Sequence, residues 1–280
     1  MKTLFVSDLD GTLFDNSAEL SEHTVQTINR LIESGLHFTV ATARSPWSIV
    51  KIKKLNINVP AVLLNGVCVY DVRKAAFVHI ESFGEALFKR LLPILHEHDL
   101  SGFLYLIKDD TLEVFYENVR TPHALAFMRE RQIQFGKRFT RAYPYTEYDF
   151  SGMLPVYYTV CDRLEALEPF YNRVKTLEGL RAEFYRDIYN KDHFFLELLS
   201  EKASKSHALR FIKQAYGFDR VVVFGDNLND LPMFSCADYR VAVGNAHEEV
   251  KRNADEVIKS NAENGVADWL LENYKRFTDG

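Results

Sequence analysis

Short apolar segments alternate with segments of helical periodicity in the N-terminal part of the chain. Residues 3–7, 36–41 and 61–64 are runs of apolar and β-branched residues, which predict buried strands. Between the first two runs, residues 22–34 carry apolar side chains at helical spacing, and Ser21 precedes them as a predicted N-cap. Strands that alternate with helices at short intervals predict a parallel sheet covered by helices.

The pattern changes after about residue 77 and returns to the first type after about residue 190. The intervening segment is rich in Phe and Tyr, and its predicted strands alternate in polarity, which is typical of an antiparallel sheet. Strands are predicted there at residues 102–107, 111–115 and 156–161, and helices at residues 85–96, 122–130 and 164–176. Downstream, helices are predicted at residues 202–216 and 267–274, and strands at residues 220–224 and 239–243. The predicted organisation is therefore an α/β core formed by residues 1–80 and 191–280, with an inserted α+β domain at residues 81–190.

Composition narrows the class of protein. The 280 residues are 47% hydrophobic and 26% charged, as in an ordinary globular protein with its own core. The formal net charge of -5 argues against a general nucleic-acid binder, and no apolar run is long enough to span a bilayer. Three cysteines lie far apart without metal-type spacing, which indicates buried or free thiols in a reducing cytoplasm. We therefore expect a cytoplasmic protein that binds neither nucleic acid nor membrane, and the sequence predicts no oligomeric state.

Three polar clusters follow predicted parallel strands. They are Asp8 with Asp10, Thr42, and the group Asp226, Asn229 and Asp230. Ligands of open α/β sheets bind at the carboxyl ends of the strands, so the sheet would bring these clusters together.

Asp8 and Asp10 are two residues apart on an extended segment, so their carboxylates point the same way and repel each other. A hard cation with oxygen ligands relieves such repulsion, and Mg²⁺ suits a phosphate substrate. Each cluster also has a simpler interpretation when taken alone: a solvated turn at Gly11, a helix N-cap at Thr42, or acidic residues in a first helical turn at Asp226. Taken together, the three polar clusters favour a single binding site at this edge of the sheet.

Four segments resemble, in order, the motifs of the haloacid dehalogenase superfamily of phosphatases. The first is Asp-Leu-Asp-Gly-Thr-Leu at residues 8–13, and the second is Val-Ala-Thr-Ala-Arg at residues 40–44. The third surrounds Lys205, and the fourth is Gly-Asp-Asn-Leu-Asn-Asp at residues 225–230. The long insert and the Asn65-Gly66 pair are similar to the Cof-type branch, and the resemblance covers nearly the whole chain. Two positions depart from the family pattern, since Ala43 and Ser206 stand where glycine is usual.

The resemblance implies a Rossmann-like core with an α+β cap and a role for each motif residue. Asp8 is implied to be the nucleophile that forms an aspartyl-phosphate, and Asp10 the general acid and base. Thr42 and Lys205 are implied to contact the phosphoryl group, with Lys202 as a nearby rival for the lysine. The implied Mg²⁺ site comprises Asp8, Asp10 through its backbone carbonyl, Asp226 and Asp230, the last either as a ligand or as a support. The implied phosphate-binding residues are Thr42, Ala43, Asn65, Lys205 and Asn229.

The implied substrates are small phosphorylated metabolites such as sugar phosphates or nucleotide-related monoesters. Two other functions fit the same motifs. A phosphomutase or phosphotransferase would use the same aspartates, and a metabolite sensor would bind without turnover. The presence of Asp8, Asp10, Lys205 and Asp226 argues against a sensor, which needs neither a nucleophile nor an acid.

Overall fold

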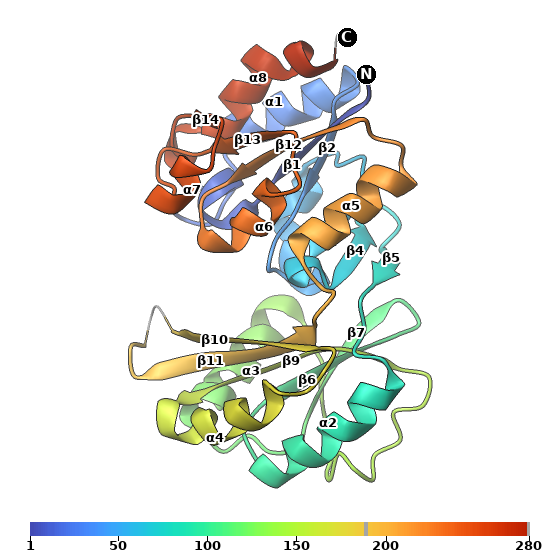
Figure 1. Cartoon of the computed structure of the whole chain (residues 1–280). Coiled ribbons are helices and arrows are strands. Elements are labelled where there is room, and N and C mark those ends of the chain that lie inside the picture. The colour runs from blue at the N-terminus through green and yellow to red at the C-terminus, as the bar shows by residue number, and fades with distance from the viewer. Residues whose placement is uncertain (188–189, 279–280) are drawn as a thin grey trace. The chain divides into compact units, whose positions relative to one another are not determined.

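A computed structural model describes residues 1–187 and 190–278, and these form two compact units (Figure 1). Unit 1 consists of Met1–His79 together with the chain from Ala203 onward, and unit 2 is Ile80–Lys202. The boundary predicted between residues 190 and 191 is wrong, because the strand β11 (His193–Ser200) pairs with two strands of unit 2. No helix in the described part of the chain combines the length and apolar character needed to cross a membrane.

Unit 1 is built on a five-stranded parallel sheet of order β14-β13-β12-β1-β2. The strand β1 lies inside the sheet and every one of its residues is buried, which explains the unbroken apolar run that predicted it. Ser7 at its carboxyl end is level with Phe224 on one neighbour and Val40 on the other. The strands are β1 (Thr3–Ser7), β2 (His37–Val40), β12 (Arg220–Gly225), β13 (Tyr239–Ala242) and β14 (Glu256–Val257).

Helices cover both faces of this sheet. In Figure 1, α1 (Glu22–Glu33) and α8 (Gly265–Thr278) lie together on one side, and α5 (Lys205–Ala215) and α6 (Leu231–Phe234) lie on the other. The Ser21 side chain accepts a hydrogen bond from the backbone N–H of Thr24, so the predicted cap of α1 is confirmed. A 3₁₀ helix at Pro46–Lys54 and the short helix α7 (Glu248–Arg252) are further helical elements of unit 1.

A small second sheet of order β3-β4-β5 extends unit 1. The strand β3 (Ala61–Leu63) is bridged in parallel to the main sheet through Ala41 and Val62, and it pairs antiparallel with β4 (Cys68–Asp71). The third member is β5 (Ala76–Ile80). Sequence analysis predicted β3 but not the two strands that follow it.

Unit 2 contains a six-stranded sheet of order β10-β11-β9-β6-β7-β8, antiparallel except for the β7–β8 pair. Figure 1 shows the helices α2 and α4 on one face and α3 on the other. An apolar core packs beneath α2 and α4, so the predicted α+β insert is present. Its elements are α2 (Glu85–His98), β6 (Phe103–Lys108), β7 (Thr111–Tyr116), α3 (Pro122–Phe135), β8 (Phe139–Arg141), β9 (Leu154–Arg163), α4 (Leu164–Val174), β10 (Leu180–Arg186) and β11.

Candidate active site

Two carboxylates stand where adjacent parallel strands end. Asp8 follows β1 directly, and Asp226 follows β12 directly. The backbone N–H of Asp8 donates a 3.0 Å hydrogen bond to the carbonyl of Phe224, which fixes the two strand ends at one level. The main sheet therefore brings together residues that are more than two hundred positions apart in the sequence.

Lys205 joins this edge from the start of α5. Its Nζ donates a 2.7 Å hydrogen bond to Oδ1 of Asp8 and another of 2.7 Å to Oδ1 of Asp230. The Lys205 side chain is 1% exposed. Burial alone would lower its pKa, but the two carboxylates together raise it, so the lysine is held as a cation.

The observed start of α5 also decides between Lys205 and Lys202 as the lysine of the site. The helix was predicted from residue 202, but it begins at Lys205, because Ser204 caps it by accepting a hydrogen bond from the N–H of His207. Lys202 lies outside the helix and is exposed. The buried lysine of the site is therefore Lys205.

Asp230 is fully buried and holds the loop after β12. Its Oδ2 accepts hydrogen bonds from the backbone N–H groups of Asp226 at 3.0 Å and Asn227 at 3.1 Å. Since its Oδ1 already accepts from Lys205, both oxygens have protein partners. Asp230 thus fixes the position of Asp226 as well as that of Lys205.

Asp226 is further oriented by the segment that follows β1. The Thr12 hydroxyl donates a 2.7 Å hydrogen bond to Oδ1 of Asp226. A Cβ at Gly11 would lie only 2.4 Å from Oδ2 of Asp226, so the absence of a side chain at this position allows the two loops to meet. Asn245 donates to the carbonyl of Gly11 at 2.7 Å and supports the same loop.

The carboxyl groups of Asp8, Asp226 and Asp230 fit a metal ion, since one oxygen from each lies within 4.8 Å of the others. Burial is the main cause that raises the pKa of Asp8 to about 8 and that of Asp226 to about 6. Three carboxylates beside the one ammonium of Lys205 leave two negative charges uncompensated when all are ionised. A divalent cation with a preference for oxygen ligands would offset that charge.

Asp10 lies outside this three-carboxylate group. Its side chain is 51% exposed, and its two oxygens accept hydrogen bonds from Nε of Arg44 at 2.7 Å and from Nη2 at 2.6 Å. Arg44 lies in the second motif, at residues 40–44, and no role was predicted for it from the sequence. Thr12 was missed in the same way, and nothing in the local sequence around Asn245 signalled its contribution.

The loops after β2 and β3 are joined to each other. The carbonyl of Thr42 accepts a 3.0 Å hydrogen bond from the N–H of Asn65, and the Thr42 hydroxyl oxygen accepts one of 3.2 Å from the N–H of Arg44. Oδ1 of Asn65 is buried and has no hydrogen-bond partner among the described residues. Ala43, in the loop after β2, is exposed, and so is Asn229, which lies in the 3₁₀ helix Leu228–Asp230 after β12. The structure therefore places Thr42 and Asn65 side by side.

Comparison with known proteins gives the family. The model of the haloacid dehalogenase-like hydrolases matches residues 5–270. The chain belongs to this family. The 5-amino-6-(5-phospho-D-ribitylamino)uracil phosphatase YwtE of Bacillus subtilis is 27% identical over 94% of this chain and 95% of its own. The pyridoxal phosphate phosphatase YbhA of Escherichia coli is 26% identical, with 94% and 95% covered.

A solved structure agrees with this assignment. The crystal structure of TM0651 from Thermotoga maritima superposes with a TM-score of 0.76 at 25% identity and covers 97% of each chain. The resemblance inferred from the four motifs and the α/β fold with an inserted α+β cap are confirmed. The expected enzyme class, a family phosphatase that hydrolyses phosphomonoesters, is confirmed at the level of the family.

Proposed function

We propose that this haloacid dehalogenase-like hydrolase is a Mg²⁺-dependent phosphatase that hydrolyses small phosphomonoesters through an aspartyl-phosphate on Asp8. The observation that carries the proposal is the buried bridge of Lys205 between Asp8 and Asp230, beside Asp226. A lysine in this place neutralises part of the charge that builds up when an anionic substrate meets an anionic nucleophile.

Asp8 is the proposed nucleophile. Its Oδ1 accepts a hydrogen bond from Lys205, which leaves the second oxygen to attack phosphorus. The new bond joins that oxygen to phosphorus, and the bond from phosphorus to the ester oxygen breaks. Mg²⁺, held by Asp8, Asp226 and the backbone carbonyl of Asp10, would neutralise charge on the phosphoryl oxygens.

Asp230 is proposed to support the metal site rather than to bind the ion directly. Its four hydrogen-bonding positions are partly filled by Lys205 and by two backbone N–H groups. These contacts orient Asp226 and Lys205, which then act on the ion and on the phosphoryl group.

Asp10 is the proposed general acid and base. It would protonate the leaving oxygen and then take a proton from the water that hydrolyses the intermediate. Both oxygens of Asp10 accept hydrogen bonds from Arg44, so Asp10 must turn away from Arg44 before it can reach the leaving oxygen. Its exposure leaves room for that rotation.

The phosphoryl oxygens are proposed to contact the loops after β2, β3 and β12. The Thr42 hydroxyl and the Ala43 N–H would donate to them, with Asn65 and Asn229 beside them. The Nδ2 group of Asn65 would be the donor to a phosphoryl oxygen, whereas its unpartnered Oδ1 is a buried acceptor that would take a donor such as a substrate hydroxyl.

The proposed substrates are small phosphorylated metabolites. YwtE and YbhA are similar to this chain to nearly the same degree, yet their names give a ribitylaminouracil phosphate and pyridoxal phosphate as substrates. Both compounds are phosphomonoesters of small polar molecules. This shared chemistry supports the substrate class, and sugar phosphates fall within it.

The direct test is phosphate release from a panel of phosphomonoesters, with Mg²⁺ and with a chelator. We expect Mg²⁺-dependent release from several members, and a half-saturating Mg²⁺ concentration at least about tenfold higher for Asp226→Ala. Isomer formation with little free phosphate would favour a mutase instead. Binding of phosphorylated compounds without turnover would favour a sensor, and either result would overturn the proposal.

A further inference from the structure

A second group of metal-ligating side chains lies within unit 2. His123, Cys161 and Asp187 each place one ligand atom within 4.8 Å of the others. They come from three separate segments: the first turn of α3, the strand β9, and the residue after β10. Spacing along the chain therefore gave no signal of this group, and Cys161 was predicted to be a buried or free thiol.

The register of the sheet explains why these residues meet. Cys161 on β9 is level with Phe195 on β11. The N–H of Asp187 donates a 2.9 Å hydrogen bond to the carbonyl of His193, which extends the β10–β11 ladder by one residue. Because side chains two residues apart share a face, Cys161 and Asp187 lie on the same side of the sheet.

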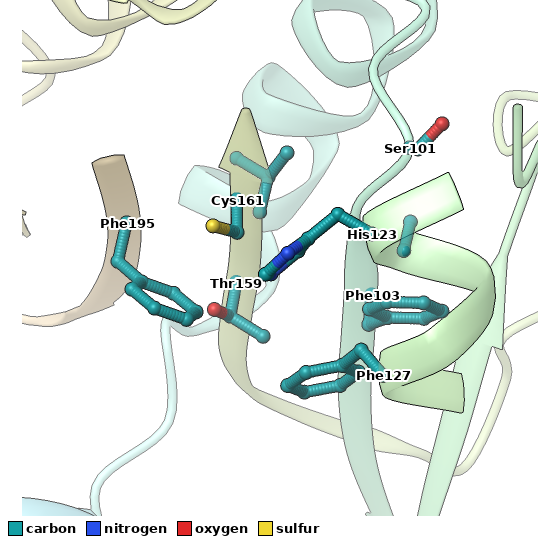
Figure 2. Close-up of a pocket in the computed structure, with 9 residues that line it drawn as sticks. Ser101, Phe103, His123, Phe127, Thr159, Cys161 and Phe195 are labelled. Carbon is teal, nitrogen blue, oxygen red and sulfur yellow. The ribbon is translucent and has the colours of Figure 1, made fainter. Parts of the chain in front are cut away.

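The helix α3 brings the imidazole to that face. Figure 2 shows the ring of His123 reaching from α3 toward β9, where Cys161 and Thr159 lie. The ring lines a small cavity together with Cys161, Thr159 and three phenylalanines, and the cavity offers about 10 Å³ to the centre of a water molecule. That volume is about enough for one water.

The surroundings are buried and contain an unpaired polar atom. Cys161 is 7% exposed and Asp187 is 6% exposed. The ring of His193 stacks on that of His123 with 5.2 Å between centroids. Nδ1 of His193 is buried and lacks a hydrogen-bond partner among the described residues. An orphaned nitrogen on a ring that stacks on His123 indicates a missing polar group.

We propose that His123, Cys161 and Asp187 form a Zn²⁺ site. A thiolate, an imidazole and a carboxylate form a donor set typical of zinc, and they differ from the all-oxygen set at the edge of the unit 1 sheet. Zinc bonds of about 2.0 to 2.3 Å would draw the three ligand atoms to within about 4 Å of one another, which requires only small side-chain rotations.

Three protein ligands leave the fourth tetrahedral position to water, and Nδ1 of His193 is a partner for that water. On binding, the Cys161 thiol releases its proton to solvent, and the sulfur bonds to the metal. The ion would tie α3 to β9 and to the end of β10. This site lies wholly within unit 2 and does not depend on the proposed function.

The test is a titration of the chelator-stripped, reduced full-length protein with Co²⁺, which substitutes for Zn²⁺ and reports on its ligands. We expect a thiolate-to-cobalt charge-transfer band and tetrahedral d–d bands that saturate at one equivalent, and Zn²⁺ should displace them. Co²⁺ at the carboxylates of Asp8 and Asp226 has no sulfur ligand and would not give the charge-transfer band, so the two sites are distinguishable.

Single substitutions identify the side chains that give rise to the charge-transfer band. Cys161→Ala should abolish it, and His123→Ala should weaken Co²⁺ binding at least about tenfold. Cys236→Ala is the matched control, since Cys236 lies in unit 1, and it should retain the full spectrum. Far-UV circular dichroism of the metal-free variants checks their folding. Absence of the band from the wild-type protein at saturating Co²⁺, or its persistence in Cys161→Ala, would overturn the proposal.

Discussion

Lys205 shares its positive charge between two buried carboxylates. Lys205→Met keeps much of the side-chain volume but leaves Asp8 and Asp230 without their cation. Removing one partner of a buried ion pair lowers the free energy of unfolding by about 3–5 kcal/mol. We expect a loss of this size in urea denaturation with a chelator present. Lys202→Met removes an exposed lysine and should change stability by less than about 0.5 kcal/mol. Equal effects of the two variants would contradict the bridge.

Lys137 is a buried lysine in unit 2 and is 5% exposed. Burial, with a smaller effect of Arg131, lowers its pKa from 10.5 to about 7. Between these two values the unfolded chain binds more protons than the folded one, so the free energy of unfolding rises with pH. Lys137→Met should flatten this rise and increase stability at pH 7 by up to about 5 kcal/mol. Denaturation measured from pH 7 to 10 checks this prediction. The control Lys108→Met changes an exposed lysine and should keep the wild-type dependence of the free energy of unfolding on pH.

The sequence predicted which residues gather at the edge of the unit 1 sheet, but not most of their hydrogen-bond partners. Asp8, Asp226 and Lys205 were found because each belongs to a short motif at a strand or helix end. The contacts from Arg44 to Asp10 and from Thr12 to Asp226 depend on loop conformations that only the folded sheet sets. The Zn²⁺ ligands proposed in unit 2 share no motif at all.

At the scale of elements, the loop after β3 fits closely against the start of α5. Gly66 has a φ of +96°, and a Cβ there would lie 2.1 Å from the carbonyl oxygen of Ser204. Gly66→Ala should therefore displace the residue that precedes Lys205 and reduce kcat at least about tenfold, since a shift of about 1 Å can lower rates this strongly. The same variant should lower the free energy of unfolding by more than about 2 kcal/mol.

Gly35 provides the control for backbone strain. Its φ is +100°, but nothing lies within 4 Å of a Cβ at that position. Gly35→Ala should therefore lower stability by about 1–2 kcal/mol and leave kcat unchanged. If the two alanine variants behave alike in both assays, close packing against Ser204 is not what matters at Gly66.

Elements with strong local signals were predicted close to their observed bounds. The cap at Ser21 and the buried runs of β1 and β12 are examples, because burial on both faces gives a continuous apolar segment. The strands β4, β5, β8, β10, β11 and β14 were missed. β11 mixes apolar with polar residues and is specified by its pairing with β9 and β10, which are distant in sequence or poorly marked.

At the scale of the whole molecule, the order of the motifs was enough to predict a two-part chain, but the end of the insert was placed too early. Unit 2 has an apolar core of its own under α2 and α4. We therefore expect a fragment of residues 80–202 to fold alone and to unfold cooperatively in urea. The comparison fragment of residues 80–190 lacks β11, which lies inside the sheet, and should show no cooperative transition. Similar transitions in both fragments would contradict the assignment of β11 to this unit.

The nucleophile is the central claim, and Asp8→Asn tests it most directly. Phosphate release by this variant should be measured with Mg²⁺ and a phosphomonoester that the wild-type protein hydrolyses, alongside the exposed control Asp219→Asn. An amide cannot form the acyl phosphate, so we predict that kcat falls at least on the order of 10³-fold while far-UV circular dichroism is unchanged. The control should keep wild-type turnover. Turnover by Asp8→Asn within about tenfold of wild type would contradict the account, because another group would then have to accept the phosphoryl group.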